Sequence, residues 1–254
     1  MRRVIFNQKG GVGKSSIAVN LAALAAGRGL STLLIDLDAQ ANATHYLLGD
    51  AQPEVNVAGF FEQFLSFRLL SDNLEEFVLN TSYENLDLVA ASRDLLELQS
   101  RLEAKHKIYK LKEGIEALGE YDAVFIDTPP ALNFYTLSAL IAADSCLIPF
   151  DCDAFSRQAI YGLMQAVAEV QADHNPALVV EGIVVNQYQS QASLPRRVVE
   201  ELRAEDLPVM KTLLPASVKM RESHEAAKPL VYFAPKHKLS LAFGALFDEL
   251  RQPV

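Results

Sequence analysis

The sequence is short of cysteine and of long apolar runs, and each shortage excludes a class of protein. Its 254 residues include two cysteines, Cys146 and Cys152, whose spacing does not fit a Cys-x-x-Cys metal or redox site. No run of about 18 apolar residues is present to span a membrane, and the first residues lead straight into a strand pattern without the features of a signal peptide. We therefore expect two core thiols and a cytoplasmic protein.

Positive charge is also scarce. The chain has 23 Lys and Arg against 32 Asp and Glu, which gives a formal net charge of -9. Such a charge repels nucleic acid as a whole, so any DNA binding needs a local basic patch. Hydrophobic residues make up 50% of the chain, and at this length they are enough to bury the core of a single α/β domain.

The chain is organised around a glycine-rich loop near its start. Residues 4–6 favour a strand, three glycines lie between residues 10 and 13, and Lys14 opens a helical pattern. Glycines let several backbone N–H groups approach a phosphate closely, and the helix N-terminus adds a positive dipole. We expect Lys14 to reach the β- and γ-phosphates and Ser15 to offer its hydroxyl to Mg²⁺. A plain turn between strand and helix is the weaker alternative.

Two further apolar runs end in carboxylates. Residues 32–35 predict a buried parallel strand that leads to Asp36 and Asp38, and residues 123–126 predict another that leads to Asp127. Ligands bind at the carboxyl edge of such sheets, where a Mg²⁺-bound water needs an acceptor. Acidic capping of the short helix after Ala43 is the alternative explanation for the first pair.

Alternating strand and helix patterns without a Gly/Ser-rich or Pro-rich linker predict an α/β fold: a doubly wound, mostly parallel sheet flanked by helices. We expect one domain over residues 1–254, with further strands at 86–89, 145–150, 179–186 and 209–214. Helical patterns cover 94–118 and 155–170. Phenylalanines 60, 61, 64 and 67 recur at helical spacing and predict a core stripe.

The last helical pattern carries an apolar stripe at residues 239, 243, 246, 247 and 250. Its opposite face has Asp248 and Glu249, whereas a helix on a membrane surface favours Lys and Arg there. We expect this helix to pack on the sheet, and we expect no membrane partner.

The segment Lys9-Gly-Gly-Val-Gly-Lys-Ser, with Gln8 where a standard P-loop has glycine, resembles the deviant Walker A loop of the ParA/MinD family of P-loop ATPases. Residues 36–44, Asp-Leu-Asp-Ala-Gln-Ala-Asn-Ala-Thr, resemble the family's first switch, with Ala39 and Ala41 replacing its usual Pro and Gly. Asp127-Thr-Pro-Pro resembles its Walker B and second switch. Because no helix-turn-helix region precedes the loop, the chain most resembles the short, Soj-like ParA members.

The resemblance implies roles for individual residues. The catalytic residues would be Lys9, which crosses to the partner's nucleotide, Lys14, and Asp38, which orients the water. The metal ligands would be Ser15, Asp38 and Asp127 around Mg²⁺. ATP or ADP would contact Lys9, Gly10, Gly11, Val12, Gly13, Lys14, Ser15, Ser16, Asn186 and Pro215. A β-turn asparagine explains Asn186 equally well.

The resemblance also implies a slow, Mg²⁺-dependent ATPase that forms a homodimer around ATP and associates with the nucleoid. The region 196–238 has nine Lys/Arg against six acids, and nonspecific DNA binding requires phosphate contacts without base reading. Our candidates are Lys219 and Arg221, then Arg196 and Arg197; scattered surface charge explains them nearly as well.

In such a cycle, an activating ParB-like protein or cargo adaptor would stimulate hydrolysis and release the dimer. The cargo would be a plasmid, a chromosome region or a protein assembly. Two alternatives remain open: a MinD-like positioning ATPase on a membrane, and a metabolic P-loop enzyme of the dethiobiotin synthetase type.

Overall fold

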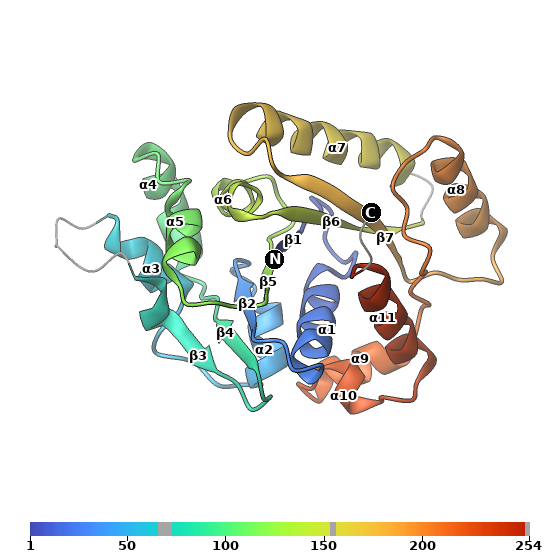
Figure 1. Ribbon diagram of the computed structural model, residues 1–254, viewed down its shortest axis with the longest axis horizontal. Coiled ribbons are helices and arrows are strands. Elements are labelled where there is room, and N and C mark those ends of the chain that lie inside the picture. Colours follow the sequence, from blue (N-terminus) through green and yellow to red (C-terminus); the bar gives the residue numbers. More distant parts are fainter. Residues whose placement is uncertain (66–72, 153–155, 252–254) are drawn as a thin grey trace.

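The computed structural model describes residues 1–65, 73–152 and 156–251. At its centre is a seven-stranded sheet in the order β3-β4-β2-β5-β1-β6-β7 (Figure 1). In chain order the strands are β1 (Arg2–Ile5), β2 (Thr32–Asp36), β3 (Val78–Asn80), β4 (Leu86–Val89), β5 (Ala123–Asp127), β6 (Ser145–Asp151) and β7 (Val179–Asn186). All neighbours pair in parallel except β3, which runs antiparallel to β4 at the edge of the sheet.

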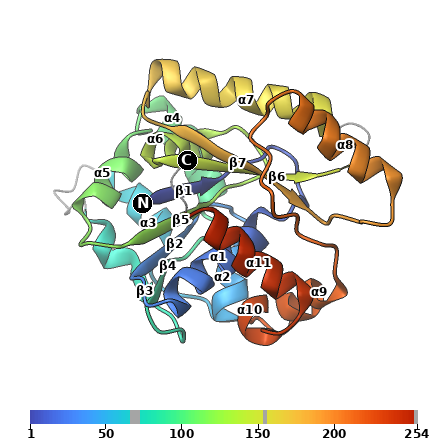
Figure 2. The same ribbon diagram turned by 45° about the vertical axis from the view of Figure 1, so that its right-hand side comes forward.

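Helices cover both faces of this sheet (Figure 2). One face carries α3 (Val57–Gln63), α4 (Leu95–Ala104), α5 (Lys110–Ala117), α6 (Phe134–Ala142), α7 (Ser156–Asp173) and α8 (Ser193–Ala204). The other carries α1 (Lys14–Gly27), α2 (Asn42–Leu48), α9 (Val218–Glu225), α10 (Leu230–Phe233) and α11 (Lys238–Glu249). A 3-10 helix, Leu74–Phe77, precedes β3. The predicted doubly wound, mostly parallel α/β sheet is confirmed.

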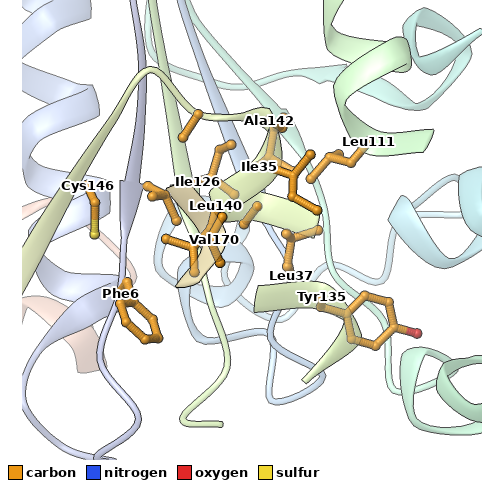
Figure 3. Close-up of a cluster of buried hydrophobic side chains, with 14 of the residues drawn as sticks. Phe6, Ile35, Leu37, Leu111, Ile126, Tyr135, Leu140, Ala142, Cys146 and Val170 are labelled. Carbon is orange, nitrogen blue, oxygen red and sulfur yellow. The ribbon is translucent and has the colours of Figure 1, made fainter. Parts of the chain in front are cut away.

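The central strands are apolar because helices bury both of their faces. Every residue of β2 and of β5 is buried. Figure 3 shows the core on one side of the sheet, where Ile35 and Ile126 of these two strands meet Leu140 of α6 and Val170 of α7. This rigid centre fixes the positions at which the strands end.

The segment predicted as a strand at 209–214 does not form one. Val209 at its start and Pro215 just after its end make isolated parallel bridges to Ile183 and Tyr188. The N–H groups of Met210 and Leu214 donate to the Ile183 and Val185 carbonyls of β7 at 3.0 and 2.9 Å. Between them, the N–H groups of Lys211 and Thr212 donate to the Glu249 carboxylate at 2.7 and 3.0 Å, so no continuous ladder forms. The prediction from the apolar pattern was therefore wrong for this segment.

The helical pattern over 94–118 is divided in two. The chain turns between α4 and α5, where His106 has φ of 53°. Phe60 and Phe61 of the predicted core stripe are fully buried, Phe64 is partly buried and packs on the core, and Phe67 lies outside the described residues.

The apolar stripe of α11 is buried, as expected. Its five members are at most 7% exposed, and they pack in one cluster with residues of α1. None of the helices in the described residues has the length and apolar character needed to cross a membrane.

Candidate functional site

The glycine-rich loop joins β1 to α1 at the carboxyl edge of the sheet. Gly11 and Gly13 have φ values of 78° and 94°, a left-handed conformation that glycine adopts without strain. Gly13 is the N-cap of α1, and no side chain caps this end of the helix. The first N–H groups of α1 therefore keep their capacity to bind an anion.

Three amide side chains brace this loop, two from the end of β7 and one from the start of the loop itself. Asn186 Nδ2 donates to the Val12 carbonyl at 2.9 Å, and Gln187 Nε2 donates to the Gly11 carbonyl at 3.0 Å. Asn7 donates to the Pro149 carbonyl and accepts from the Lys9 N–H, at 2.7 and 2.8 Å. Of the three, Asn186 alone was predicted from sequence, because the contacts of Asn7 and Gln187 depend on how strands β6 and β7 lie beside the loop.

A cavity of about 390 Å³ opens beside the loop. It brings together seven of the residues predicted from sequence: Gly10, Gly11, Gly13, Lys14, Ser15, Ser16 and Asp38. Val12, in the same loop, is fully buried and does not line the cavity. The remaining wall is formed by Gln40, Asn42, His45, Tyr46, Pro130 and His224. Gln40, Asn42 and Pro130 belong to the two predicted switch segments, whereas His45, Tyr46 and His224 were not singled out from the sequence. His224 comes from α9, so no local pattern could place it there.

Lys14 is 7% exposed, and its Nζ donates to the Lys9 carbonyl at 3.1 Å. Burial lowers the pKa of Lys14, while Asp127 and Asp38 oppose that change. An ammonium group held in a cavity among carboxylates is well placed to meet phosphate oxygens.

Asp127 ends β5 and is completely buried. Neither of its carboxylate oxygens has a hydrogen bond of standard geometry with any described residue. Burial raises the pKa of Asp127 well above its ordinary value, and the neighbouring Asp36 raises it further, whereas Ser15 and Lys14 act in the opposite direction. A buried carboxylate whose oxygens lack standard hydrogen bonds to the described residues fits a cation, because Mg²⁺ is held through one or two carboxylates together with phosphates and waters.

Asp36 and Asp38 follow β2 but do different things. Asp36 is fully buried and accepts from the Thr44 N–H and hydroxyl, both at 2.8 Å, and from the Asp38 N–H at 3.0 Å. It therefore holds the start of α2, as the capping alternative predicted. Asp38 lines the cavity at 7% exposure and accepts from the Gln40 N–H at 3.0 Å. Burial raises the pKa of Asp38.

Lys9 lies outside the cavity wall and has an intramolecular partner. Its Nζ donates to both oxygens of Asp151 at 2.7 and 3.0 Å, and its side chain is 45% exposed. Pro215 is half-buried and bridges to Tyr188. The roles assigned to these residues, as to Asn186, stay predictions.

The four basic candidates lie on two helices that stand apart in both views (Figures 1 and 2). On α8, Arg196 pairs with Glu200 at 3.0 Å and Arg197 with Glu201 at 3.8 Å. On α9, Lys219 pairs with Glu222 at 2.5 Å, and Arg221 is exposed. The fold thus brings Lys219 and Arg221 together and leaves the two arginines of α8 separate.

Comparison with known proteins connects this geometry to a family. A family model described as an AAA domain matches residues 3–180. The chromosome partitioning protein ParA of Myxococcus xanthus is 34% identical over 250 residues, covering 97% of this chain and 86% of that protein. The sporulation initiation inhibitor protein Soj of Bacillus subtilis is 33% identical over 238 residues, covering 92% and 91%.

The fold is also similar to that of cobyrinic acid a,c-diamide synthase from Mycobacterium smegmatis, solved with bound ATP analogue and magnesium. The TM-score is 0.82 at 25% identity, and the match covers 97% of this chain and 92% of that one.

Proposed function

The chain belongs to the ParA/MinD family of P-loop ATPases, and from this premise we propose that it is a Soj-like switch that dimerises around ATP, binds nonspecific DNA and is released by partner-stimulated hydrolysis. Asp127 carries the proposal, because a fully buried carboxylate whose oxygens have no hydrogen bond of standard geometry with any described residue calls for a cation beside the phosphate loop. We also propose that residues 1–254 form one ATPase domain. The packing of α11 with α1 across the sequence supports a single unit.

The proposed ligands are ATP or ADP with Mg²⁺. Lys14 and the N-terminus of α1 would bind the phosphates, and the Ser15 hydroxyl, Asp127 and Asp38 would hold Mg²⁺ or its waters. Bound Mg²⁺ would neutralise charge that develops on the phosphates. Asp38 would orient the attacking water, for which its place on the cavity wall is suitable.

Dimer formation would use Lys9. This lysine is half exposed and already holds a carboxylate through its ammonium group, so reaching a partner's phosphate would exchange one anionic contact for another. Exposed ion pairs contribute about 0–1 kcal/mol, so releasing Asp151 would cost little compared with a charge-assisted bond to phosphate.

DNA contact would depend chiefly on Lys219 and Arg221, which share α9, with Arg196 and Arg197 on α8 as secondary contacts. Acidic neighbours compensate three of these cations, so a dimer that doubles the surface would bind DNA more strongly than a monomer. The names of the ParA relatives support chromosome partitioning as the purpose, with a ParB-like protein or cargo adaptor as activator and the nucleoid in the cytoplasm as location.

The decisive experiment is retention of the purified protein on nonspecific duplex DNA with ATP, ADP or no nucleotide, at two salt concentrations. We expect retention that requires ATP and weakens with salt, because phosphate contacts release counterions. Asp38→Ala should keep a dimer on DNA, and Lys14→Ala should neither bind nucleotide nor be retained. Absence of retention while ATP still drives dimerisation would overturn the DNA-binding proposal and favour a membrane or protein scaffold, and normal ATP hydrolysis by Asp38→Ala would overturn its assigned role.

A metabolic ATPase is a second candidate, and one observation favours it. A polar hollow of about 730 Å³ adjoins the nucleotide cavity and shares Gln40, Asn42 and His45 with it. If a small metabolite raised the rate of ATP hydrolysis, and one molecule of it were consumed for each ATP hydrolysed, the hollow would be a substrate site. The switch proposal would then fail.

A further inference from the structure

A polar cluster joins the nucleotide cavity to the C-terminal helices. Ser16 Oγ lies 2.9 Å from His224 Nε2, and Asn20 donates to the Ser16 carbonyl at 2.8 Å. On the other side, the Tyr46 hydroxyl lies 2.6 Å from Ser223 Oγ. These residues come from α1, α2 and α9, three segments far apart in the sequence (Figure 1).

The cluster is well ordered by its own contacts. Asn20 and Ser223 are fully buried, and Tyr46 is 2% exposed. Asn20 Oδ1 accepts from the Val231 N–H, and the Tyr46 hydroxyl accepts from the Leu230 N–H, at 3.1 and 3.2 Å. Buried polar networks that are satisfied in this way hold a unique arrangement of their elements.

His224 is the member of the cluster that reaches the cavity from α9. It lines the wall together with Ser16 and Tyr46, and its ring packs edge-on to the Tyr46 ring with centroids 4.6 Å apart. Ser16 lies in the first turn of α1, directly after Lys14 and Ser15. The hydrogen bond between His224 and Ser16 therefore orients a hydroxyl in the helical turn that faces the proposed phosphate site.

We propose that His224 is a positioning residue of the nucleotide site, which fixes the Ser16 hydroxyl toward a bound phosphate and makes α9 part of the wall that recognises the nucleotide. The imidazole ring, wedged against Tyr46, restricts the rotation of that hydroxyl before the nucleotide arrives. Pre-organised groups bind more tightly because less freedom is lost on binding. This inference rests on the proposed nucleotide site, but not on DNA binding or dimerisation.

The test compares His224→Leu, which removes the bond, with His224→Gln, whose amide can restore it. We expect the dissociation constants for Mg-ATP and Mg-ADP to rise about tenfold in His224→Leu, as for one lost hydrogen bond, and by less than about threefold in His224→Gln. In steady-state hydrolysis, KM for ATP should rise while kcat at saturating ATP stays unchanged.

His174 provides a matched control. Its Nδ1 lies 2.8 Å from the Tyr109 hydroxyl and its ring packs against the same tyrosine, so it makes the same kinds of contact outside the cavity wall. His174→Leu should leave both dissociation constants unchanged.

Wild-type affinity in a folded His224→Leu variant, or a lower kcat with unchanged KM, would overturn the inference. If His224→Leu does not fold, a cycle of Ser16→Ala, His224→Asn and the double variant replaces it, since the shorter asparagine ends before Ser16. Losses of affinity that add fully would then overturn the inference, because two groups that share a bond lose it once. Nucleotide binding by Lys14→Ala would instead refute the assigned site itself.

Discussion

Asp36 and Asp127 occupy paired positions at the ends of neighbouring strands, yet their surroundings are opposite. The two residues stand opposite each other in the β2–β5 register, and both are fully buried. Asp36 accepts three hydrogen bonds that hold the start of α2, whereas Asp127 accepts none of standard geometry from the described residues. Asp36 therefore stabilises the fold, whereas the carboxylate of Asp127 has the surroundings expected for the proposed cation ligand.

The largest effect is expected from Asp127→Ala. Loss of the carboxylate should lower Mg²⁺-dependent ATP hydrolysis at least about 100-fold, since a bound metal supplies several kcal/mol of transition-state stabilisation. The free energy of unfolding without metal should not fall by more than about 1 kcal/mol in Asp127→Asn, which buries a neutral group instead of an acid. Steady-state hydrolysis and urea unfolding measure the two effects.

Asp87→Asn is the control for that experiment. Asp87 also lies on a central strand, β4, and accepts from the Tyr121 hydroxyl at 2.9 Å. Hydrolysis by this variant should equal that of the wild type. Normal activity in Asp127→Ala would mean that the unpaired carboxylate serves no cation.

Asp36→Ala should have its main effect on stability, in contrast to substitution of Asp127, whose main effect should be on ATP hydrolysis. It leaves the Thr44 N–H, the Thr44 hydroxyl and the Asp38 N–H without their acceptor, so the free energy of unfolding should fall by about 3 kcal/mol. Urea unfolding of the metal-free protein measures this loss. A stable Asp36→Ala variant that no longer responds to Mg²⁺ would show that the two aspartates have exchanged roles.

The change of stability with pH should be smaller than the effect of Asp36→Ala, and both Asp36 and Asp127 should contribute to it. Burial raises the pKa of Asp36 to about 6, and the pKa of Asp127 lies well above its ordinary value. Above about pH 4 the folded state therefore keeps protons that the unfolded state has lost, so the stability of the metal-free protein should fall as pH rises, by at most about 1.4 kcal/mol per unit for each group. The midpoint of thermal unfolding should depend less on pH in Asp127→Asn than in the wild type. If the two proteins had the same pH dependence, Asp127 would be excluded as one of its causes.

Thr44→Ser should have the smallest effect. It keeps the hydroxyl that donates to Asp36 and accepts from the Ala91 N–H at 2.9 Å. The free energy of unfolding should therefore change by less than about 1 kcal/mol, the effect of the lost methyl group. Thr44→Val removes the hydroxyl and should cost about 1 kcal/mol more. Equal urea midpoints for the two variants would mean that the hydroxyl contributes nothing.

Local patterns predicted much of the sheet and of the phosphate loop. The apolar runs that became β2, β5 and β6 are buried almost throughout, and those of β4 and β7 are buried over most of their length, so their composition alone identifies them. The loop was recognisable because phosphate binding fixes residue types at close spacing, as in Gly13, Lys14 and Ser15.

The remaining features depend on contacts between distant residues. Residues 209–214 have the composition of a strand, but Glu249 takes two of their N–H groups. The edge strand β3, only three residues long, gives no periodic signal. Asp36 and Asp38 are equivalent by spacing, and Thr44 decides which of them is structural. His224 reaches the cavity from 208 residues away, beyond any sequence pattern.

The two cysteines differ in a way that has a practical use. Cys146 is fully buried in the core, and burial raises the pKa of its thiol, while Cys152 is partly exposed directly after Asp151, the partner of Lys9. A thiolate is the species that alkylating reagents attack, so at neutral pH a maleimide should modify Cys152 long before Cys146. The native chain can therefore be labelled at a single position beside the Lys9–Asp151 pair, and a fluorophore there would report on that pair without an engineered cysteine.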